Sequence, residues 1–317
     1  QIFATASAAL LKFLDKGMTD TVIQNLDAPD IPLWALWAVQ EYAARYGMEQ
    51  TRANYGDFVS RVIDDILADK HPNLHVDDRG LIETAGHRTA ASWMAATMPG
   101  STVPLIPRTG YLVELNALWY DALQFAVELF DGDSAFDDRR ENWSGVSASF
   151  APAFISMFLN EAGYLWDYVE RSGPNPEVRP NMAIAIGLRH TPLDRRQRKG
   201  VLDVVTRELL TPKGLRTLSP KSGNYRPLYV GTPEERAKAH HNGPARPWLM
   251  GFYASAYLKV FGMSGVGYID RMLIGFEEEM SQGCIGSLSQ LYDGNPPFNG
   301  HGAVSHAVNV AEVLRAL

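Results

Sequence analysis

The sequence has little cysteine and no block of basic residues. Its 317 residues include one cysteine, Cys284. That excludes an intramolecular disulfide and any multi-cysteine metal site, and it is typical of a reducing compartment, so we expect a cytoplasmic protein. The net charge is −7, with Lys and Arg dispersed along the chain. This pattern argues against nucleic acid or an anionic membrane surface as a partner.

Long apolar runs are also missing. The longest uncharged run, residues 142–160, contains Gly145, Pro152 and four serines. It predicts a loop that enters a buried helix rather than a membrane span. We find no secretory signal, and the chain begins within a helical pattern. We therefore expect a piece of a longer protein, with a further domain preceding Gln1.

No convincing strand alternation occurs, whereas helical periodicity recurs along the whole chain. The pattern predicts roughly ten helices, at residues 5–16, 32–46, 52–68, 115–127, 147–161, 181–188, 194–210, 246–261, 266–282 and 303–317, besides the less regular segment 86–100. Residues 131–141 and 211–241 are predicted as loops, and Asp30 and Asp194 as N-caps. We expect an all-α fold, a single α/α toroid that extends over residues 1–317.

Charged, amide and aromatic residues gather at the start of the helix that follows Pro107. Arg108, Glu114 and Asn116 precede Trp119 and Tyr120 within a short stretch. This cluster favours a site for a polar, ring-shaped ligand. For Glu114 a second interpretation stays open, because a carboxylate in the first turn of a helix is stabilised by the helix dipole.

Tryptophans recur beside polar residues and turns, at Trp34, Trp93, Trp119 and Trp248. Each fits a buried core position. Each also fits a sugar site, because a pyranose ring has an apolar face that stacks on aromatic rings and hydroxyl edges that need polar partners.

Two further patterns suggest metals, and we favour neither. Asp137-Asp138 resembles the acidic pair that binds magnesium diphosphate in helical terpene synthases, but adjacent arginines and Gly132 favour a solvated loop. His240-His241 has no carboxylate at the spacing expected of a metal site. We therefore expect no metal and no cofactor.

Several motifs, in order along nearly the whole chain, resemble the amylo-α-1,6-glucosidase domain of glycogen debranching enzymes. They are Pro107-Arg-Thr-Gly, Val113-Glu-Leu-Asn-Ala-Leu-Trp-Tyr120, Arg179-Pro-Asn181, Leu210-Thr-Pro-Lys-Gly-Leu-Arg-Thr-Leu-Ser-Pro220, His241-Asn-Gly243, Pro247-Trp248, Tyr292-Asp-Gly294 and Val310-Ala-Glu-Val-Leu-Arg315. The resemblance implies a six-hairpin α/α barrel that lacks its first helices, an α-glucan partner, and inverting hydrolysis of α-1,6-linked glucose. Inversion needs one protonated carboxyl and one carboxylate about 6.5–9.5 Å apart.

Both implied catalytic positions are substituted. The family pattern Thr-Trp-Met-Asp at the general acid is Ser92-Trp-Met-Ala95 here, and Ser-Glu at the general base is Ser289-Gln290. Alanine exchanges no proton, and glutamine is no base near neutral pH. Natural loss of hydrolysis and deliberate substitution would both give this pattern. Glu114 stays open as a further catalytic candidate.

Other departures from the family follow the same trend. They are Met182 for Gln, Ala237 for Asp, Pro244-Ala-Arg246 for Thr-Val-Trp, and His306-Ala-Val308 for Gln-Ala-Trp. The resemblance and the local chemistry together predict the substrate-binding residues Asp30, Trp34, Trp93, Arg108, Asn116, Trp119, Tyr120, His241, Trp248 and Asp293. We expect either a glycoside hydrolase or a non-catalytic glucan-binding or scaffold protein.

Overall fold

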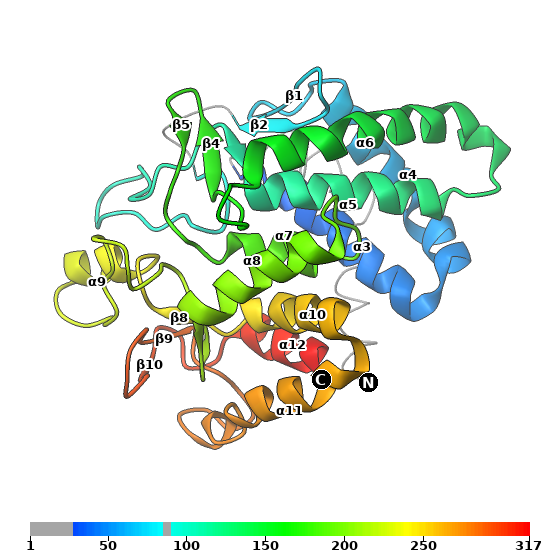
Figure 1. Cartoon of the computed structure of the whole chain (residues 1–317). Helices are drawn as coiled ribbons and strands as arrows, with labels where there is room; N and C mark the ends of the chain where they lie inside the picture. The colour runs from blue at the N-terminus through cyan, green and yellow to red at the C-terminus, as the bar shows by residue number, and fades with distance from the viewer. Residues whose placement is uncertain (1–27, 85–89) are drawn as a thin grey trace.

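The computed structural model describes residues 28–84 and 90–317, and they are mainly helical (Figure 1). In chain order the helices are α3 (Ile31–Tyr46), α4 (Met48–Leu67), α5 (Val113–Leu129), α6 (Asp137–Phe158), α7 (Asn181–Gly187), α8 (Arg195–Glu208), α9 (Pro233–Ala239), α10 (Leu249–Phe261), α11 (Val266–Ile274) and α12 (Ala307–Ala316). The helix predicted at residues 5–16 and part of segment 86–100 lie outside the described residues.

Inner and covering helices alternate along the chain. Helices α3, α5, α7, α10 and α12 contact one another in that order, while α4, α6, α8 and α11 pack against them (Figure 1). Helix α3 also reaches α10 directly, since the Trp37 and Phe252 ring centroids lie 5.4 Å apart. This alternation agrees with the predicted toroid. Its closure into six hairpins stays a prediction.

The expectation of a fold without strands was wrong. Three antiparallel sheets are present: β1 (Leu74–Val76) with β2 (Ile82–Thr84), β3 (Tyr111–Leu112) with β4 (Tyr168–Glu170) and β5 (Gly173–Pro174), and a five-stranded sheet in the order β10-β9-β8-β7-β6. That last sheet comprises β6 (Leu210–Thr211), β7 (Gly214–Arg216), β8 (Ala245–Arg246), β9 (Leu291–Tyr292) and β10 (Gly300–His301). Strands of two or three residues are too short to show a period of two.

Local signals explain where two helices begin. Pro32 lies in the first turn of α3, where its missing N–H is not needed. Asp194 caps α8 as predicted, because its carboxylate accepts from the Gln197 N–H while the Gln197 side chain accepts from the Asp194 N–H. Asp30 occupies the N-cap position of α3, but its side chain makes no capping hydrogen bond.

Helix α6 begins ten residues earlier than the predicted start at residue 147, at Asp137. The segment predicted as a loop at 131–141 therefore contains a short 3-10 helix (Ser134–Phe136) and the first turn of α6. Asp137 and Asp138 lie in that turn, where the helix dipole favours carboxylates. Polar composition misled the prediction because α6 is exposed along much of its first half.

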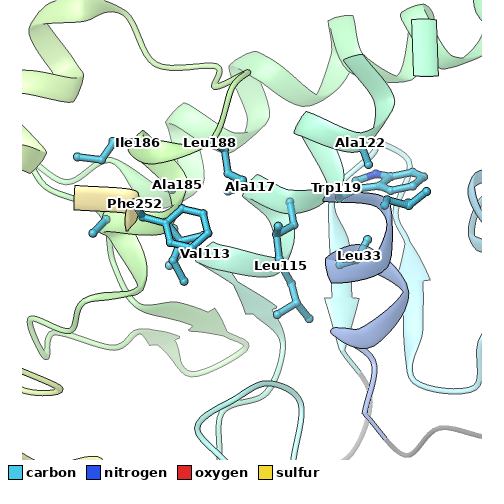
Figure 2. Close-up of a cluster of buried hydrophobic side chains, with 14 of the residues drawn as sticks. Leu33, Val113, Leu115, Ala117, Trp119, Ala122, Ala185, Ile186, Leu188 and Phe252 are labelled. Atoms are coloured by element: carbon cyan, nitrogen blue, oxygen red, sulfur yellow. The ribbon is translucent and has the colours of Figure 1, made fainter. Parts of the chain in front are cut away.

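Buried apolar residues from Leu33 to Val313 form one hydrophobic cluster. Figure 2 shows Leu33 of α3 near Trp119 of α5, and Phe252 of α10 beside Ala185 and Ile186 of α7. The α7–α10 contact is close because Gly187 faces the Phe252 backbone. A Cβ at Gly187 would lie 2.5 Å from the Phe252 carbonyl oxygen. This packing fixes α7 and α10 relative to each other.

Candidate functional site

Aromatic side chains from three segments enclose a cavity of about 340 Å³, within the size range of small-molecule sites. The aromatic rings of this pocket are Trp34, Trp37, Trp93, Trp248 and Phe252. Trp93 and Trp248 meet edge to face at 5.2 Å, and Trp34 and Trp248 do so at 6.1 Å. Three of the four predicted tryptophans therefore come together in one pocket.

Polar residues complete the same pocket: His240, His241, Arg246, Gln290, His306 and Glu312. The structure thus brings His241 and Gln290 to the predicted tryptophans. Among residues 28–84 and 90–317, Nδ1 of His241, Nε of Arg246 and Nδ1 of His306 are buried and have no hydrogen-bond partner. Buried polar atoms are generally paired, so these three atoms are candidates for binding a ligand.

The five-stranded sheet places two of these residues side by side. Arg246 lies on β8, and Gln290 directly precedes β9. Ala245 pairs with Tyr292 across β8 and β9, so Gln290, just before β9, lies near the strand that carries Arg246. The Gln290 backbone N–H donates to the Ala303 carbonyl, and its side-chain oxygen accepts from the Ala303 N–H at 3.3 Å. The position matched to the general base is therefore held firmly at the pocket.

Burial keeps the three pocket histidines neutral. It lowers the pKa of His240 to about 3 and the pKa of His241 well below its usual value, and the charge of Arg246 adds to both shifts. The pKa of His306 is also lowered, by burial first and then by Arg246. Each neutral imidazole can donate from one nitrogen and accept at the other.

Glu312 is the carboxylate of this pocket, and it is already paired. Burial raises the pKa of Glu312, and Arg315 opposes that rise. The Arg315 Nη2 lies 2.6 Å from the Glu312 carboxylate, and its guanidinium stacks over the Phe252 ring at 4.8 Å. Glu312 therefore serves mainly to anchor Arg315 between α10 and α12.

Arg108 and Glu114 lie together in the core and do not line the pocket. The Arg108 guanidinium donates to both Glu114 oxygens, with Nη2 at 2.7 Å, and its Nε donates to Asp167 at 2.8 Å. Glu114 is 0% exposed. Ser92 accepts a further hydrogen bond from Arg108 and so ties the loop before Ala95 to this network. The geometry favours a structural role for Arg108 and Glu114.

Asp30 is buried and interacts electrostatically with this network. Burial raises its pKa from 3.8 to about 6, and the charge of Glu114 adds to the rise, while hydrogen bonding with Trp34 and the charge of Arg108 oppose it. Asp30 is not among the residues that line the pocket, although it interacts with Trp34, which does.

Three other predicted binding residues lie away from the pocket. Asn116 is fully buried, and its side chain hydrogen-bonds to the backbone of Ile82 and Leu112. Trp119 is buried in the core and donates to the Gly80 carbonyl. Tyr120 lies in a different cavity and stacks on Phe150. We leave these three out of the proposed site.

Asp293 and Ala95 flank the pocket without lining it. Asp293 is buried, accepts from the Tyr229 backbone N–H, and lies 2.9 Å from Nε2 of His301. It therefore shapes the loop that follows Gln290. Ala95 is exposed, between Trp93 of the pocket and Ala96 of a neighbouring cavity that shares His240.

Trp93 is fixed by its indole N–H, which donates to the Asn181 side-chain oxygen at 2.8 Å. The Asn181 amide in turn donates to Asp167 at 2.8 Å. The loop that carries Ala95 is thus fastened to α7 and to the Arg108 network. A ligand in the pocket would meet a rigid Trp93.

The predicted site residues omit seven residues that line the pocket: Trp37, His240, Arg246, Phe252, His306, Val308 and Glu312. Trp37 lies one turn from Trp34, and this spacing could have indicated it. Arg246 was noted only as a departure from the family motif, because its burial depends on segments that are distant in the sequence.

The metal interpretations gain no support. Within residues 28–84 and 90–317 no group of three or more His, Cys, Asp or Glu side chains is arranged to hold a metal ion. Asp137 instead pairs with Arg140 at 3.3 Å. Across the same described ranges, no helix has the length and apolarity needed to cross a bilayer.

Comparisons with known proteins agree with this arrangement. The glycogen debranching enzyme of Saccharomyces cerevisiae is 25% identical over 253 residues, which are 67% of this chain and 16% of the yeast protein. This chain therefore spans about a sixth of that relative.

Solved structures show the same fold. A GH78 family rhamnosidase of Bacillus sp. GL1 aligns with a TM-score of 0.61 and 16% identity over 96% of this chain and 29% of that one. An uncharacterized conserved protein from Thermus thermophilus aligns with a TM-score of 0.62 and 12% identity over 91% of this chain and 76% of that one. The amylo-alpha-1,6-glucosidase family matches residues 13–315. The chain belongs to the amylo-alpha-1,6-glucosidase family of glycoside hydrolases.

Proposed function

We propose that the pocket binds a sugar unit at the branch points of an α-glucan, and that the inverting hydrolysis of α-1,6-linked glucose is lost in this chain. The aromatic walls support the first part. Trp34, Trp93 and Trp248 offer apolar faces on which a pyranose ring can stack, and His241 offers a buried polar atom for a hydroxyl.

The identity of residue 290 carries the second part. Gln290 lines the pocket at the position matched to the general base, and its amide cannot take a proton from water near neutral pH. Ala95, at the position matched to the general acid, has no proton to give. Glu312 does not replace them, because inversion needs two carboxyls and Glu312 is paired with Arg315.

Glucose release from a branched limit dextrin tests the loss of hydrolysis. The chain as it stands should release no glucose above the rate of the uncatalysed reaction. The double substitution Ala95→Asp with Gln290→Glu should gain activity, and each single substitution should gain far less because both carboxyls are needed. Release by the unsubstituted chain at an enzymatic rate would overturn this part of the proposal.

Calorimetric titration with maltooligosaccharides tests the binding part. A saturable heat that disappears in Trp93→Ala supports a sugar site. A folded chain that binds neither maltooligosaccharides nor sugars with a carboxylate or phosphate group would favour a scaffold protein without a sugar ligand.

A further inference from the structure

Arg246 is a buried guanidinium without a counter-ion. Its side chain lines the pocket, is 5% exposed, and donates from Nη2 to the His240 carbonyl oxygen at 2.9 Å. Among residues 28–84 and 90–317, its Nε has no hydrogen-bond partner and no carboxylate pairs with it. The other buried arginines do have such partners: Arg108 pairs with Glu114 and Asp167, and Arg179 pairs with Glu177.

Such a residue is unfavourable in an empty pocket. Burial lowers the pKa of Arg246 to about 10, so the side chain still carries its positive charge at neutral pH. A buried ion without a partner is destabilising by several kcal/mol. An anion that enters the pocket would remove this penalty and would also satisfy the free Nε–H.

The rest of the pocket does not neutralise Arg246. The three histidines are uncharged, and Glu312 is engaged with Arg315. Gln290, where the resemblance predicts a carboxylate, lines the same pocket and carries no charge. Within the part of the chain that the structure describes, the positive charge of Arg246 in the cavity is therefore not compensated.

Four of the departures from the family motifs, Arg246, Gln290, His306 and Val308, line the pocket beside Trp93, His241 and Trp248, whereas Ala95, Met182 and Ala237 do not. The pocket therefore combines aromatic walls with one buried positive charge, at Arg246.

We infer that the pocket selects a sugar unit that bears an oxyanion, a carboxylate or a phosphate, and that Arg246 is the residue that binds it. This inference rests on the proposed sugar-binding function and narrows its ligand to an anionic hexose within or at the end of the glucan. Arg246 can grip such a group through Nε and the free donors of its fork, a geometry that suits both oxyanions. His241 and His306 can donate to the remaining oxygens or hydroxyls.

The competing explanation is that Arg246 merely fills the volume of the aromatic ring that the family has there. The two explanations predict different effects of removing the positive charge at residue 246. A space-filling role makes Arg246→Met a neutral change and gives no preference for an anion. Anion binding makes Arg246→Met harmful and Arg246→Lys a partial rescue, because lysine keeps the charge without the planar fork.

Isothermal calorimetry of the whole chain with glucose, glucuronate and glucose 6-phosphate tests the inference. At low ionic strength we expect one or both charged sugars to bind about tenfold or more tightly than glucose, as a charge-assisted hydrogen bond provides. The two charged sugars distinguish a carboxylate site from a phosphate site. Inorganic phosphate is titrated alongside, and it should bind more weakly than the preferred sugar.

Variants of Arg246 distinguish anion binding from space filling. Arg246→Met should abolish the preference for the charged sugar, and Arg246→Lys should keep part of it. Arg236→Gln is the matched control, since this partly exposed arginine lies on α9 at the neighbouring cavity and donates to the Gly231 carbonyl. It should leave the preference intact. Circular dichroism melting establishes that each variant is folded.

Each contrary result has a separate meaning. Equal binding of glucose and both charged sugars overturns the inference and leaves the neutral glucan site standing. A preference that persists in Arg246→Met also overturns it, because the anion would then bind elsewhere. If no sugar binds, charged or neutral, and maltooligosaccharides also fail to bind, both the inference and the proposed function fall.

Discussion

Arg108 holds both carboxylate oxygens of Glu114 within the core, and Asp167 accepts from the Nε of the same guanidinium. The three side chains are almost completely shielded from solvent. One guanidinium is thus shared by two carboxylates, and Asn181 and Ser92 connect the three side chains to the loop before the pocket. This network explains why a helix with a packed face begins with so many polar residues.

We therefore predict that Glu114→Gln destabilises the chain by about 1.5–3 kcal/mol, because the Gln amide NH2 replaces one of the two carboxylate oxygens that accept charge-assisted hydrogen bonds from Arg108 in the core. Urea denaturation followed by circular dichroism measures the change. The exposed pair of Lys199 and Asp203, 2.7 Å apart, is the control, and Asp203→Asn should shift the free energy of unfolding by less than about 1 kcal/mol. Unchanged stability with lost sugar binding would contradict the structural role and would support Glu114 as a residue of the site.

A second prediction compares Trp248, which lines the pocket, with Tyr120, which was predicted to bind substrate but lies in another cavity. Trp248→Ala should weaken sugar binding about 3- to 10-fold, the loss expected for one aromatic contact. Tyr120→Ala should leave the affinity unchanged, although it removes the ring that stacks on Phe150 at 5.3 Å and lowers the melting temperature. Calorimetry and thermal melting measure the two quantities. Equal losses of affinity would show that our assignment of Tyr120 to another cavity is wrong.

The sequence predicted most helices because their signals are local. Pro32 and Asp194 mark helix starts within a turn of their effect, and the apolar period of α5 is continuous. The start of α6 escaped prediction because its first turns are exposed and polar. The strands escaped because each has only two or three residues, too few for a recognisable alternation.

The site was predictable only where a residue's own chemistry indicated it. Tryptophan beside polar residues was such a signal, and Trp34, Trp93 and Trp248 do meet in one pocket. Whether Trp119 faces a pocket or the core depends on how α5 packs against its neighbours, which the local sequence does not encode. The burial of Arg246 likewise depends on strands and helices that are distant in the chain.

The third prediction concerns pH. The pKa of Asp30 is about 6 in the folded chain against 3.8 for the free side chain, so the folded state holds this proton more tightly. The contribution of Asp30 to stability is therefore most favourable below about pH 4 and declines as the pH rises through 6, by roughly 3 kcal/mol in all.

Asp30→Asn tests this, because asparagine does not titrate and resembles the protonated carboxyl in shape. The free energy of unfolding of Asp30→Asn minus that of the unsubstituted chain should increase between pH 4 and pH 7. Taking this difference cancels the contributions of the ionisable groups that the two chains share. Asp78→Asn, at an exposed position, is the control. A difference for Asp30→Asn that does not change with pH would contradict the assigned burial of its carboxyl.

The last prediction concerns the contact between α7 and α10, which includes the pocket residue Phe252. A Cβ at Gly187 would lie 2.5 Å from the Phe252 carbonyl oxygen and 2.9 Å from its Cα, so Gly187→Ala must push the two helices apart. We expect a loss of about 1–3 kcal/mol, as for other overpacked sites. Sugar affinity should fall as well, because Phe252 lines the pocket and its ring centroid lies 5.9 Å from that of Trp34.

Gly145→Ala in α6 is the control for Gly187→Ala. A Cβ at Gly145 meets nothing within 4 Å, and alanine should stabilise the helix by about 0.5–1 kcal/mol. If Gly187→Ala were as stable as Gly145→Ala and bound sugar normally, the close approach of α7 and α10 would not be what positions the aromatic wall.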